Sequence, residues 1–235
     1  EIENSIAVPH DDDIRLKKSD VRGSIEFKNV SFCYPGSDTC VLRDLNLSLE
    51  TGKFYVIVGV NGAGKSTFIN LMMRLYDVSS GEITLGGSNI KQYNYEDYRG
   101  IFGTVFQNYR SFEFTIAENV ALNEFEDTDE CRAEVEYRLG EAGLIEKINS
   151  LPHRTMTMLG KLFDAEGTRL SGGELQKLAL AKALYRDPKI VILDEPTSAL
   201  DAFAEDDLIQ TFGKAARGKT VFYISHRLSV AKYAD

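Results

Sequence analysis

The stretch that decides the fold is "GVNGAGKST", from Gly59 to Thr67. It fits the pattern G-x-x-x-x-G-K-[ST], follows the apolar run "FYVIV" and precedes the helical pattern "TFINLMMRLY". In that setting the glycines let backbone N–H groups turn inward around a phosphate. Lys65 supplies a positive charge for nucleotide phosphates, and the Ser66 hydroxyl is short enough to ligate Mg²⁺. The flanking elements argue against the alternative, a fortuitous glycine-rich turn.

A second motif, "KIVILDEP", ends an apolar run in two consecutive acids. Asp194 closes the predicted strand, where a carboxylate needs a cation or hydrogen-bond donors, and Mg²⁺ is a natural partner. Glu195 follows just beyond the carboxyl edge of the strand, where ligands bind in open α/β sheets. It is therefore a candidate for polarising an attacking water. The alternative for Glu195 is a solvated loop acid, which the neighbouring Asp194 makes the weaker interpretation.

The remaining patterns predict an α/β fold. "SIEFKNVSFCY" and "VLRDLNLSLETG" alternate and predict antiparallel strands. Strands buried on both faces of a parallel sheet are predicted by three unbroken apolar runs, "FYVIVG", "KIVILD" and "KTVFYIS". Shorter strands are predicted for "GEITLGG" and "IFGTVFQ", and the apolar spacing from Thr115 to Asp187 is mostly helical.

Composition narrows the class of protein. A chain of 235 residues suits one large domain, or one domain with an inserted subdomain, and the net charge of −9 disfavours a general nucleic-acid-binding surface. No apolar run reaches the about 18 residues of a membrane span, and the acidic N-terminus does not resemble a signal peptide, so we expect a soluble chain. Three cysteines lack metal-ligand spacing and are expected to be reduced, inert thiols of a cytosolic protein: Cys33, Cys40 and Cys131.

A third motif, "LSGGE" from Leu170 to Glu174, opens an amphipathic helix. Backbone N–H groups at such a helix start, together with the helix dipole, suit an anion. The alternative is an ordinary helix cap, since serine is a favoured N-cap residue. A cap explains Ser171 but not the two glycines after it, which weaken a helix start.

Taken together, the motifs resemble those of ATP-binding cassette (ABC) ATPases, the nucleotide-binding domains of ABC transporters. The resemblance runs from about Ser24 to Asp235, with six motifs in family order, and "LSGGE" matches the family's signature motif. It implies a P-loop NTPase (RecA-like) core with a parallel sheet, an N-terminal antiparallel β subdomain and an inserted α-helical subdomain. The expected domains are a linker or arm at 1–23, following a membrane domain, and the ABC ATPase domain at 24–235. The helical subdomain is expected at about 115–187. The family normally continues beyond Asp235, so truncation or disorder is expected there.

The resemblance also implies roles for single residues. Tyr34 would stack on adenine, Gln107 would contact Mg²⁺ or water, and His226 would bond the γ-phosphate; their alternatives are strand packing, a surface amide and a core histidine. The expected catalytic residues are Glu195, His226, Gln107 and Lys65. The expected nucleotide-binding residues are Tyr34, Asn61, Gly62, Ala63, Gly64, Lys65, Ser66, Thr67, Ser171, Gly172, Gly173 and Asp201. The expected metal ligands are Ser66, Gln107 and Asp194.

In this family two domains pair head to tail, and the signature serine and glycines of one cover the ATP held by the phosphate loop of the other. ATP and Mg²⁺ are therefore the expected cofactors, and a second nucleotide-binding domain is the expected partner. "NYRSFEFTIAENVAL" is similar to the segment that follows the Q-loop in exporters, so a transmembrane domain is the other partner. Tyr109, Phe112 and Phe114 lie in that contact region; the alternative is that they pack inside the helical block.

The implied function is ATP hydrolysis driving export on the cytoplasmic side of the cell membrane, without nucleic acid. "LFDAEGTRLSGG" shares mainly Glu166 and Gly167 with the corresponding exporter segment, which favours peptide or bacteriocin transport over drugs. Lys182 stands where arginine is common. The alternative is a soluble ABC ATPase of nucleic-acid repair or translation type, disfavoured by the acidic charge and the lack of a sustained heptad pattern. A non-hydrolysing regulatory cassette is a third option, against which Glu195 and His226 argue.

Overall fold

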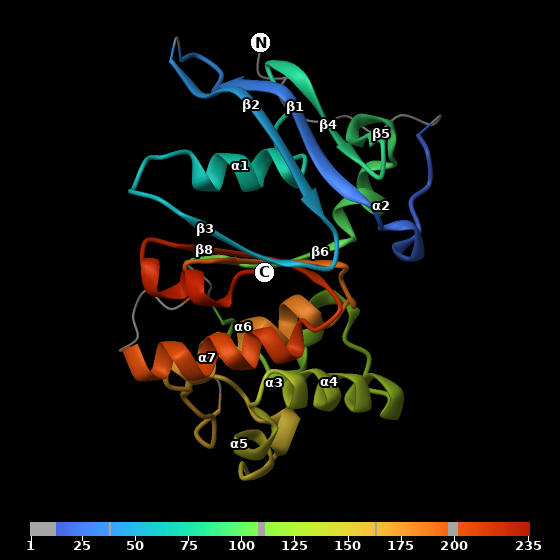
Figure 1. The fold of residues 1–235 in the computed structure, drawn as a ribbon. Helices are drawn as coiled ribbons and strands as arrows, with labels where there is room; N and C mark the ends of the chain where they lie inside the picture. Colours follow the sequence, from blue (N-terminus) through green and yellow to red (C-terminus); the bar gives the residue numbers. More distant parts are fainter. Residues whose placement is uncertain (1–12, 38, 108–110, 163, 197–201) are drawn as a thin grey trace. The chain divides into compact units, whose positions relative to one another are not determined.

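The computed structural model describes residues 13–37, 39–107, 111–162, 164–196 and 202–235 (Figure 1). They form two compact units. The first takes in the described parts of Glu1–Phe102, Pro188–Ile192 and Gly218–Asp235, and the second those of Gly103–Asp187 and Leu193–Arg217. Across the described ranges, every helix is too short or too polar to cross a lipid bilayer.

The first unit contains an antiparallel sheet of four strands in the order β2-β1-β4-β5. The strands are β1 (Ser24–Cys33), β2 (Cys40–Glu50), β4 (Ser80–Leu85) and β5 (Ser88–Asn89). Strand β1 pairs with β2 on one side and with β4 on the other, both antiparallel. Ile25 and Phe27 of β1 are buried, as the alternation of this strand predicts. The predicted antiparallel strands are therefore confirmed.

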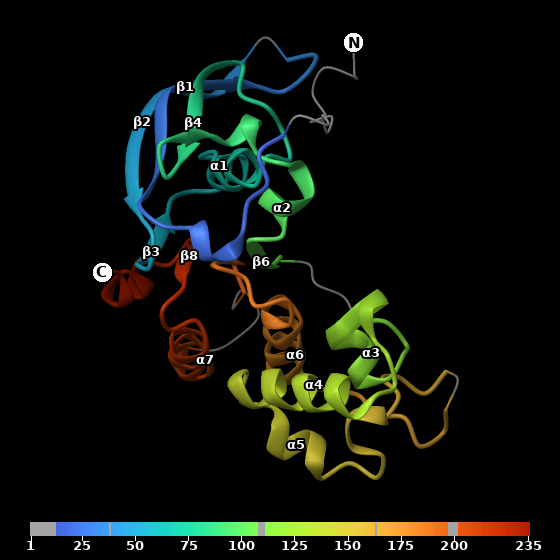
Figure 2. The same cartoon turned by 90° about the vertical axis from the view of Figure 1, so that its right-hand side faces the viewer.

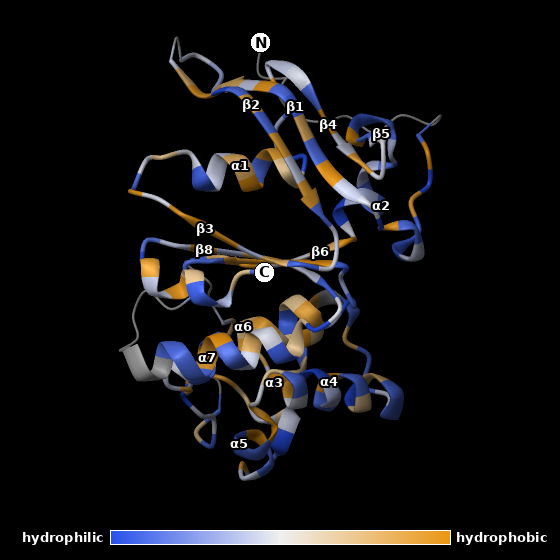
Figure 3. Ribbon diagram, viewed as in Figure 1, coloured by the Kyte–Doolittle hydropathy of each residue, from blue (hydrophilic) through white to orange (hydrophobic). Residues whose placement is uncertain are grey.

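A second sheet has the order β3-β8-β7-β6. Its strands are β3 (Phe54–Val58), β6 (Phe102–Val105), β7 (Ile190–Asp194) and β8 (Thr220–Ser225), and β8 is followed by the 3₁₀ helix η6 (Leu228–Tyr233). Strands β3 and β8 are parallel, with Phe54 opposite Val221, and β8 is buried throughout. The prediction that β3 is buried on both faces is wrong: every residue of this apolar strand is half-buried, because β3 is the edge of the sheet (Figure 3).

Helix α1 (Lys65–Met72) lies between the antiparallel sheet and the pair β3–β8 (Figures 1 and 2). Its Phe68 side chain joins the two sides: the ring stacks on Phe27 with centroids 4.7 Å apart and meets Phe222 edge-on at 6.5 Å. Both contacts belong to one hydrophobic core, in which Leu71 and Met72 are fully buried. The core thus fixes the helix that directly follows the phosphate loop.

The described part of the N-terminal arm packs on the first unit. The Ile14 N–H donates to the Gln92 carbonyl at 2.7 Å, and the Asn94 N–H donates to the Ile14 carbonyl at 2.8 Å. Arg15 pairs with Asp97 at 2.6 Å, and Leu16 is buried in the core. Short helices lie along this region: η2 (Lys18–Asp20), η3 (Ile90–Gln92) and α2 (Tyr95–Arg99). The domain boundary after residue 23 stays a prediction.

The second unit is mainly helical. Its α-helices are α3 (Ile116–Ala121), α4 (Asp129–Glu141), α5 (Ile145–Asn149), α6 (Gly172–Leu184) and α7 (Ala202–Ala215). Two 3₁₀ helices join them, η4 (Leu122–Glu124) and η5 (Arg154–Met156). Helix α6 packs against α3, α4 and α7, and its Leu180 and Leu184 are fully buried. Capping boxes form at the starts of α3 and α6, at Thr115 and Ser171.

The expectation of reduced cysteines is wrong for Cys33 and Cys40, which form a disulfide. The antiparallel register places them directly opposite each other at the ends of β1 and β2. Spacing rules for metal ligands do not detect such a pair, because it depends on strand register rather than on a sequence motif. Both residues are half-buried, and among the described residues Cys131 is the only free cysteine.

Candidate functional site

The phosphate loop joins β3 to α1, and two of its glycines adopt left-handed backbone conformations. Gly62 has φ +80° and Gly64 has φ +88°, which residues with a Cβ rarely adopt. A Cβ added at Gly64 would lie 3.1 Å from the Leu42 side chain and 3.2 Å from the Val41 side chain. The start of β2 therefore packs against the phosphate loop, and this contact supports the shape of the loop.

Lys65 begins α1, and its side chain folds back across the loop. The ammonium donates to the Gly59 carbonyl at 2.7 Å and to the Val60 carbonyl at 3.1 Å. A cation held here, at the positive end of a helix dipole, suits a phosphate group. Ser66 is exposed in the first turn of the helix. This part of the chain fits the triphosphate of a nucleotide.

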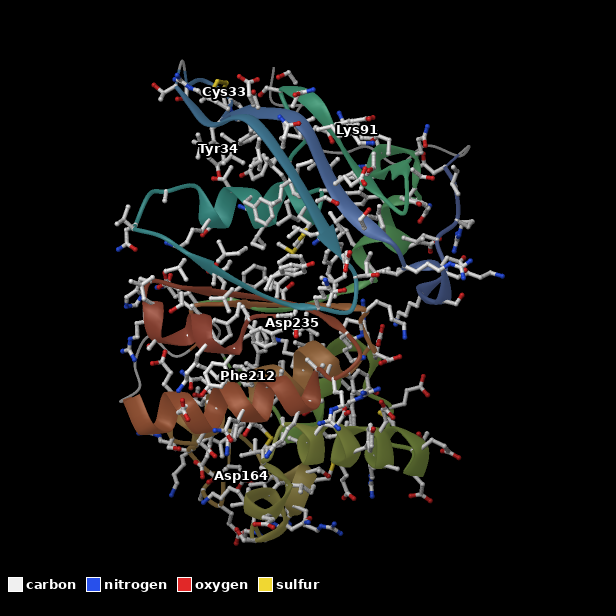
Figure 4. All side chains as sticks on the ribbon, in the orientation of Figure 1. Cys33, Tyr34, Lys91, Asp164, Phe212 and Asp235 are labelled. Carbon is white, nitrogen blue, oxygen red and sulfur yellow. A yellow bond between two sulfur atoms is a disulfide. The ribbon has the colours of Figure 1, made fainter. Side chains whose placement is uncertain are left out.

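The other predicted loop residues, Asn61 and Ala63, are exposed, whereas Thr67 is buried. The Thr67 hydroxyl forms a 3.0 Å hydrogen bond with the Tyr34 hydroxyl. The Tyr34 ring is half-buried and contacts Phe32 and Tyr76, with centroids 4.9 and 5.3 Å away (Figure 4). Tyr34 is thus part of the packing of β1 and is tied to α1; its stacking on adenine stays a prediction.

The acidic end of β7 lies in the second unit, and the structure brings the predicted Q-loop glutamine to it. The Gln107 amide donates to the Glu195 carboxylate at 3.0 Å, although the residues are 88 positions apart. They follow β6 and β7, which are neighbours in the sheet. Asp194 ends β7 and is half-buried, and Glu195 has φ +46°. A non-glycine residue in this region is strained, and six other described residues of the chain share this feature. The sequence showed neither the contact nor the strain.

Ser171 forms a complete N-terminal cap on α6. Its N–H donates to the Glu174 carboxylate at 2.7 Å, and its hydroxyl accepts from the Glu174 N–H at 3.4 Å. The capping interpretation of Ser171 is therefore confirmed, and a role in ligand binding stays a prediction. A Cβ added at Gly172 or Gly173 would meet no described atom within 4 Å. The packing of this chain alone does not explain either glycine.

The remaining predicted site residues are placed less closely. His226 is exposed directly after β8, in the first unit. Asp201 and Tyr109 lie outside the described residues. Among the residues that are described, no three His, Cys, Asp or Glu side chains gather into a metal-binding cluster. The predicted Mg²⁺ ligands instead combine the Ser66 hydroxyl and the Gln107 amide with one carboxylate, Asp194.

A pocket of about 440 Å³ opens in the second unit beside α6. It is lined by Thr104, Val105, Phe106, Ser111, Phe112, Asn119, Leu175, Leu178, Ala179 and Lys182. Phe112 is 48% exposed, and nearby Phe114 is 53% exposed, so neither side chain is buried inside the helical block; their contact with a transmembrane domain stays a prediction. The Lys182 ammonium lies 5.3 Å from the centre of the Phe112 ring, and burial lowers the pKa of this lysine.

The strand, phosphate loop and helix, joined to a parallel sheet, define a P-loop NTPase. The chain belongs to the ABC transporter family, whose family model matches residues 42–198. It is 40% identical over 224 residues to an ATP-dependent lipid A-core flippase of Yersinia pestis, covering 95% of this chain and 38% of that protein. It is 39% identical over 213 residues to the subtilin transport ATP-binding protein SpaT of Bacillus subtilis, covering 90% of this chain and 34% of that protein.

A solved structure gives the same result. The chain matches the structure of a bacterial Atm1-family ABC exporter with ATP bound at a TM-score of 0.82 and 33% identity, covering 98% of this chain and 39% of that one. The chain thus spans about two fifths of the length of these proteins or less. The predicted fold and the resemblance to an exporter-type nucleotide-binding domain are confirmed, and membership of the family implies ATP binding by an ATPase domain.

Proposed function

We propose that this chain is the ATP-binding and ATP-hydrolysing domain of an ABC exporter, and that it dimerises around two MgATP to drive export. The observation that carries the proposal is the hydrogen bond between Gln107 and Glu195. It joins two motifs, each at the carboxyl end of its strand, into one polar pair. A phosphate loop alone supports binding, whereas this pair supports hydrolysis.

The phosphate loop binds the nucleotide. Lys65 and the N–H groups around Gly62 and Gly64 hold the phosphates, with Asn61, Ala63 and Thr67 completing the loop. Ser66, Gln107 and Asp194 would hold Mg²⁺, which would neutralise the negative charge of the phosphates. Tyr34 stands beside the loop as the adenine contact.

Hydrolysis needs an oriented water, because phosphoryl transfer depends on positioning and charge stabilisation. Glu195 orients the water with its carboxylate, and the Gln107 amide holds that carboxylate in place. Lys65 and His226 stabilise the charge on the transferring group.

The second copy of the domain completes each site. Ser171, Gly172 and Gly173 cover the γ-phosphate held by the partner copy, together with Asp201. Support comes from the open space around both glycines, which lets a ligand approach the backbone closely. Release of the γ-phosphate removes the group that joins the two copies, and the dimer loosens.

The pocket beside α6 receives a segment of the transmembrane domain. Exposed Phe106 and Phe112 at an apolar pocket are typical of an interaction surface. In this proposal the domain works on the cytoplasmic side of the cell membrane, with a peptide, bacteriocin or drug as the cargo. The named relatives are transport proteins, which favours this function over nucleic-acid repair or translation.

The test is the oligomeric state of Glu195→Gln. This variant keeps the phosphate loop but loses the carboxylate that orients water, so we expect MgATP to accumulate a dimer in gel filtration and turnover to stop. Lys65→Ala is the control, which should neither bind ATP nor dimerise. A Glu195→Gln protein that binds MgATP and remains monomeric at saturation would contradict the shared site.

A further inference from the structure

The disulfide between Cys33 and Cys40 has no role in the proposed reaction, yet it lies beside the nucleotide site. It closes the turn between β1 and β2, in which the Ser37 N–H donates to the Tyr34 carbonyl at 3.0 Å. Both cysteines are half-buried, so a reductant can reach them. Figure 4 shows Cys33 and Tyr34 together at this end of β1.

One side of the disulfide leads to the helix of the phosphate loop. Cys33 directly precedes Tyr34, whose hydroxyl bonds Thr67 of α1 at 3.0 Å. The Cys33 N–H is itself fixed by the Ser79 hydroxyl at 3.1 Å. The position of the Tyr34 ring therefore depends on where the end of β1 is held.

The other side leads to the loop itself. Cys40 directly precedes Val41 and Leu42. A Cβ added at Gly64 would lie within 3.2 Å of both of these side chains. The bond thus joins two strands at the point where each contacts the phosphate-binding element. Breaking it removes the covalent limit on how far the strand ends can separate.

We propose that Cys33 and Cys40 form a redox modification site at which a dithiol reductant weakens nucleotide binding. The proposal rests on the proposed function, because it assigns regulation to the same nucleotide site. One thiolate of the reductant attacks a sulfur of the pair and forms a mixed disulfide, and its second thiol then displaces that sulfur. The reductant leaves as a disulfide, and the two cysteines gain two electrons and two protons.

The size of the effect follows from coupling between sites, which typically changes affinity by about 5- to 150-fold. We expect reduction to weaken MgATP binding roughly tenfold, near the lower end, since only the strand ends are released. The coupling is reciprocal, so saturating nucleotide should make the pair harder to reduce by the same factor. A tenfold change corresponds to about 30 mV in the midpoint potential of a two-electron couple.

The experiment measures MgATP binding by calorimetry in the Glu195→Gln background, which prevents turnover, with the chain either oxidised or reduced by dithiothreitol. Thiol titration verifies the redox state, since one thiol should react in the oxidised form and three in the reduced form. The Cys33→Ser/Cys40→Ser double variant should bind like the reduced protein and ignore the reductant. Cys131→Ser is the matched control and should keep the full redox response.

Equal affinities in the two redox states, or three reactive thiols after treatment with oxidant, would overturn the proposal. The comparison on the chain with native cysteines stands even if the double variant fails to fold. Absence of MgATP binding in both redox states would instead overturn the proposed function, so the two failures are distinguishable.

Discussion

Replacing Gly64 by alanine tests whether the start of β2 holds the phosphate loop in shape. Gly64 has φ +88°, and an L-residue in the left-handed region costs about 1–2 kcal/mol. The added Cβ would also lie 3.1 Å from Leu42 and 3.2 Å from Val41, which is closer than an ordinary contact. Overpacking of this kind costs about 1–3 kcal/mol. The expected total for Gly64→Ala is therefore about 2–5 kcal/mol.

Gly62→Ala is the matched control. Gly62 has φ +80°, but an added Cβ would meet no described atom within 4 Å. This variant carries the backbone strain without the crowding, so its expected cost is about 1–2 kcal/mol. The difference in cost between the two variants isolates the contact with β2. If that cost appears as weaker MgATP binding, each 1.4 kcal/mol, roughly, lowers the affinity tenfold.

The assay needs two measurements on each variant, because the loop can respond in two ways. If it keeps its shape, the cost appears in the free energy of unfolding, measured by denaturant titration. If it relaxes away from β2, the cost appears as weaker MgATP binding. The sum of the two losses should be larger for Gly64→Ala than for Gly62→Ala. Equal sums would refute the idea that Val41 and Leu42 support the loop.

Three further changes test other parts of the fold. Phe68→Ala removes the ring that joins Phe27 to Phe222 and should lower the free energy of unfolding by about 3–5 kcal/mol, whereas exposed Phe114→Ala should change it by under about 0.5 kcal/mol. Asp97→Ala removes the acceptor of the Arg15 side chain and the Leu16 N–H, so stability should fall by about 1 kcal/mol and proteolysis of the arm should become faster. Burial lowers the pKa of Lys182, so the unfolded chain binds more protons between that lowered value and 10.5, and stability should rise with pH across this window. Lys182→Met should raise stability at neutral pH and remove that part of the slope; an unchanged slope would contradict it.

Several strands and the phosphate loop were predictable from the sequence because they depend on local patterns. Strand β1 alternates as half-buried strands do, and β8 is an unbroken apolar run that is buried throughout. The glycines and lysine of the loop stand at fixed spacing in one short stretch. A local sequence pattern is sufficient to predict an element whose conformation depends mainly on residues close to it in the sequence.

The remaining features depend on contacts between distant residues. Strand β3 has the same apolar pattern as β8, but its position at the sheet edge leaves it half-exposed. The Cys33–Cys40 pair depends on strand register, and the Gln107–Glu195 hydrogen bond depends on β6 lying beside β7. Burial of Leu16 likewise requires the arm to pack on the first unit, although its charged sequence suggests a linker.

The left-handed backbone conformation of Glu195 lowers stability at a position where the proposed activity needs a carboxylate. Its φ of +46° is one that glycine adopts without strain. Glu195→Gly should therefore raise the free energy of unfolding by up to about 1 kcal/mol. The same change removes the carboxylate that the proposed reaction needs. Stability alone would favour glycine at this position, so the acid in this chain is explained by a role other than folding.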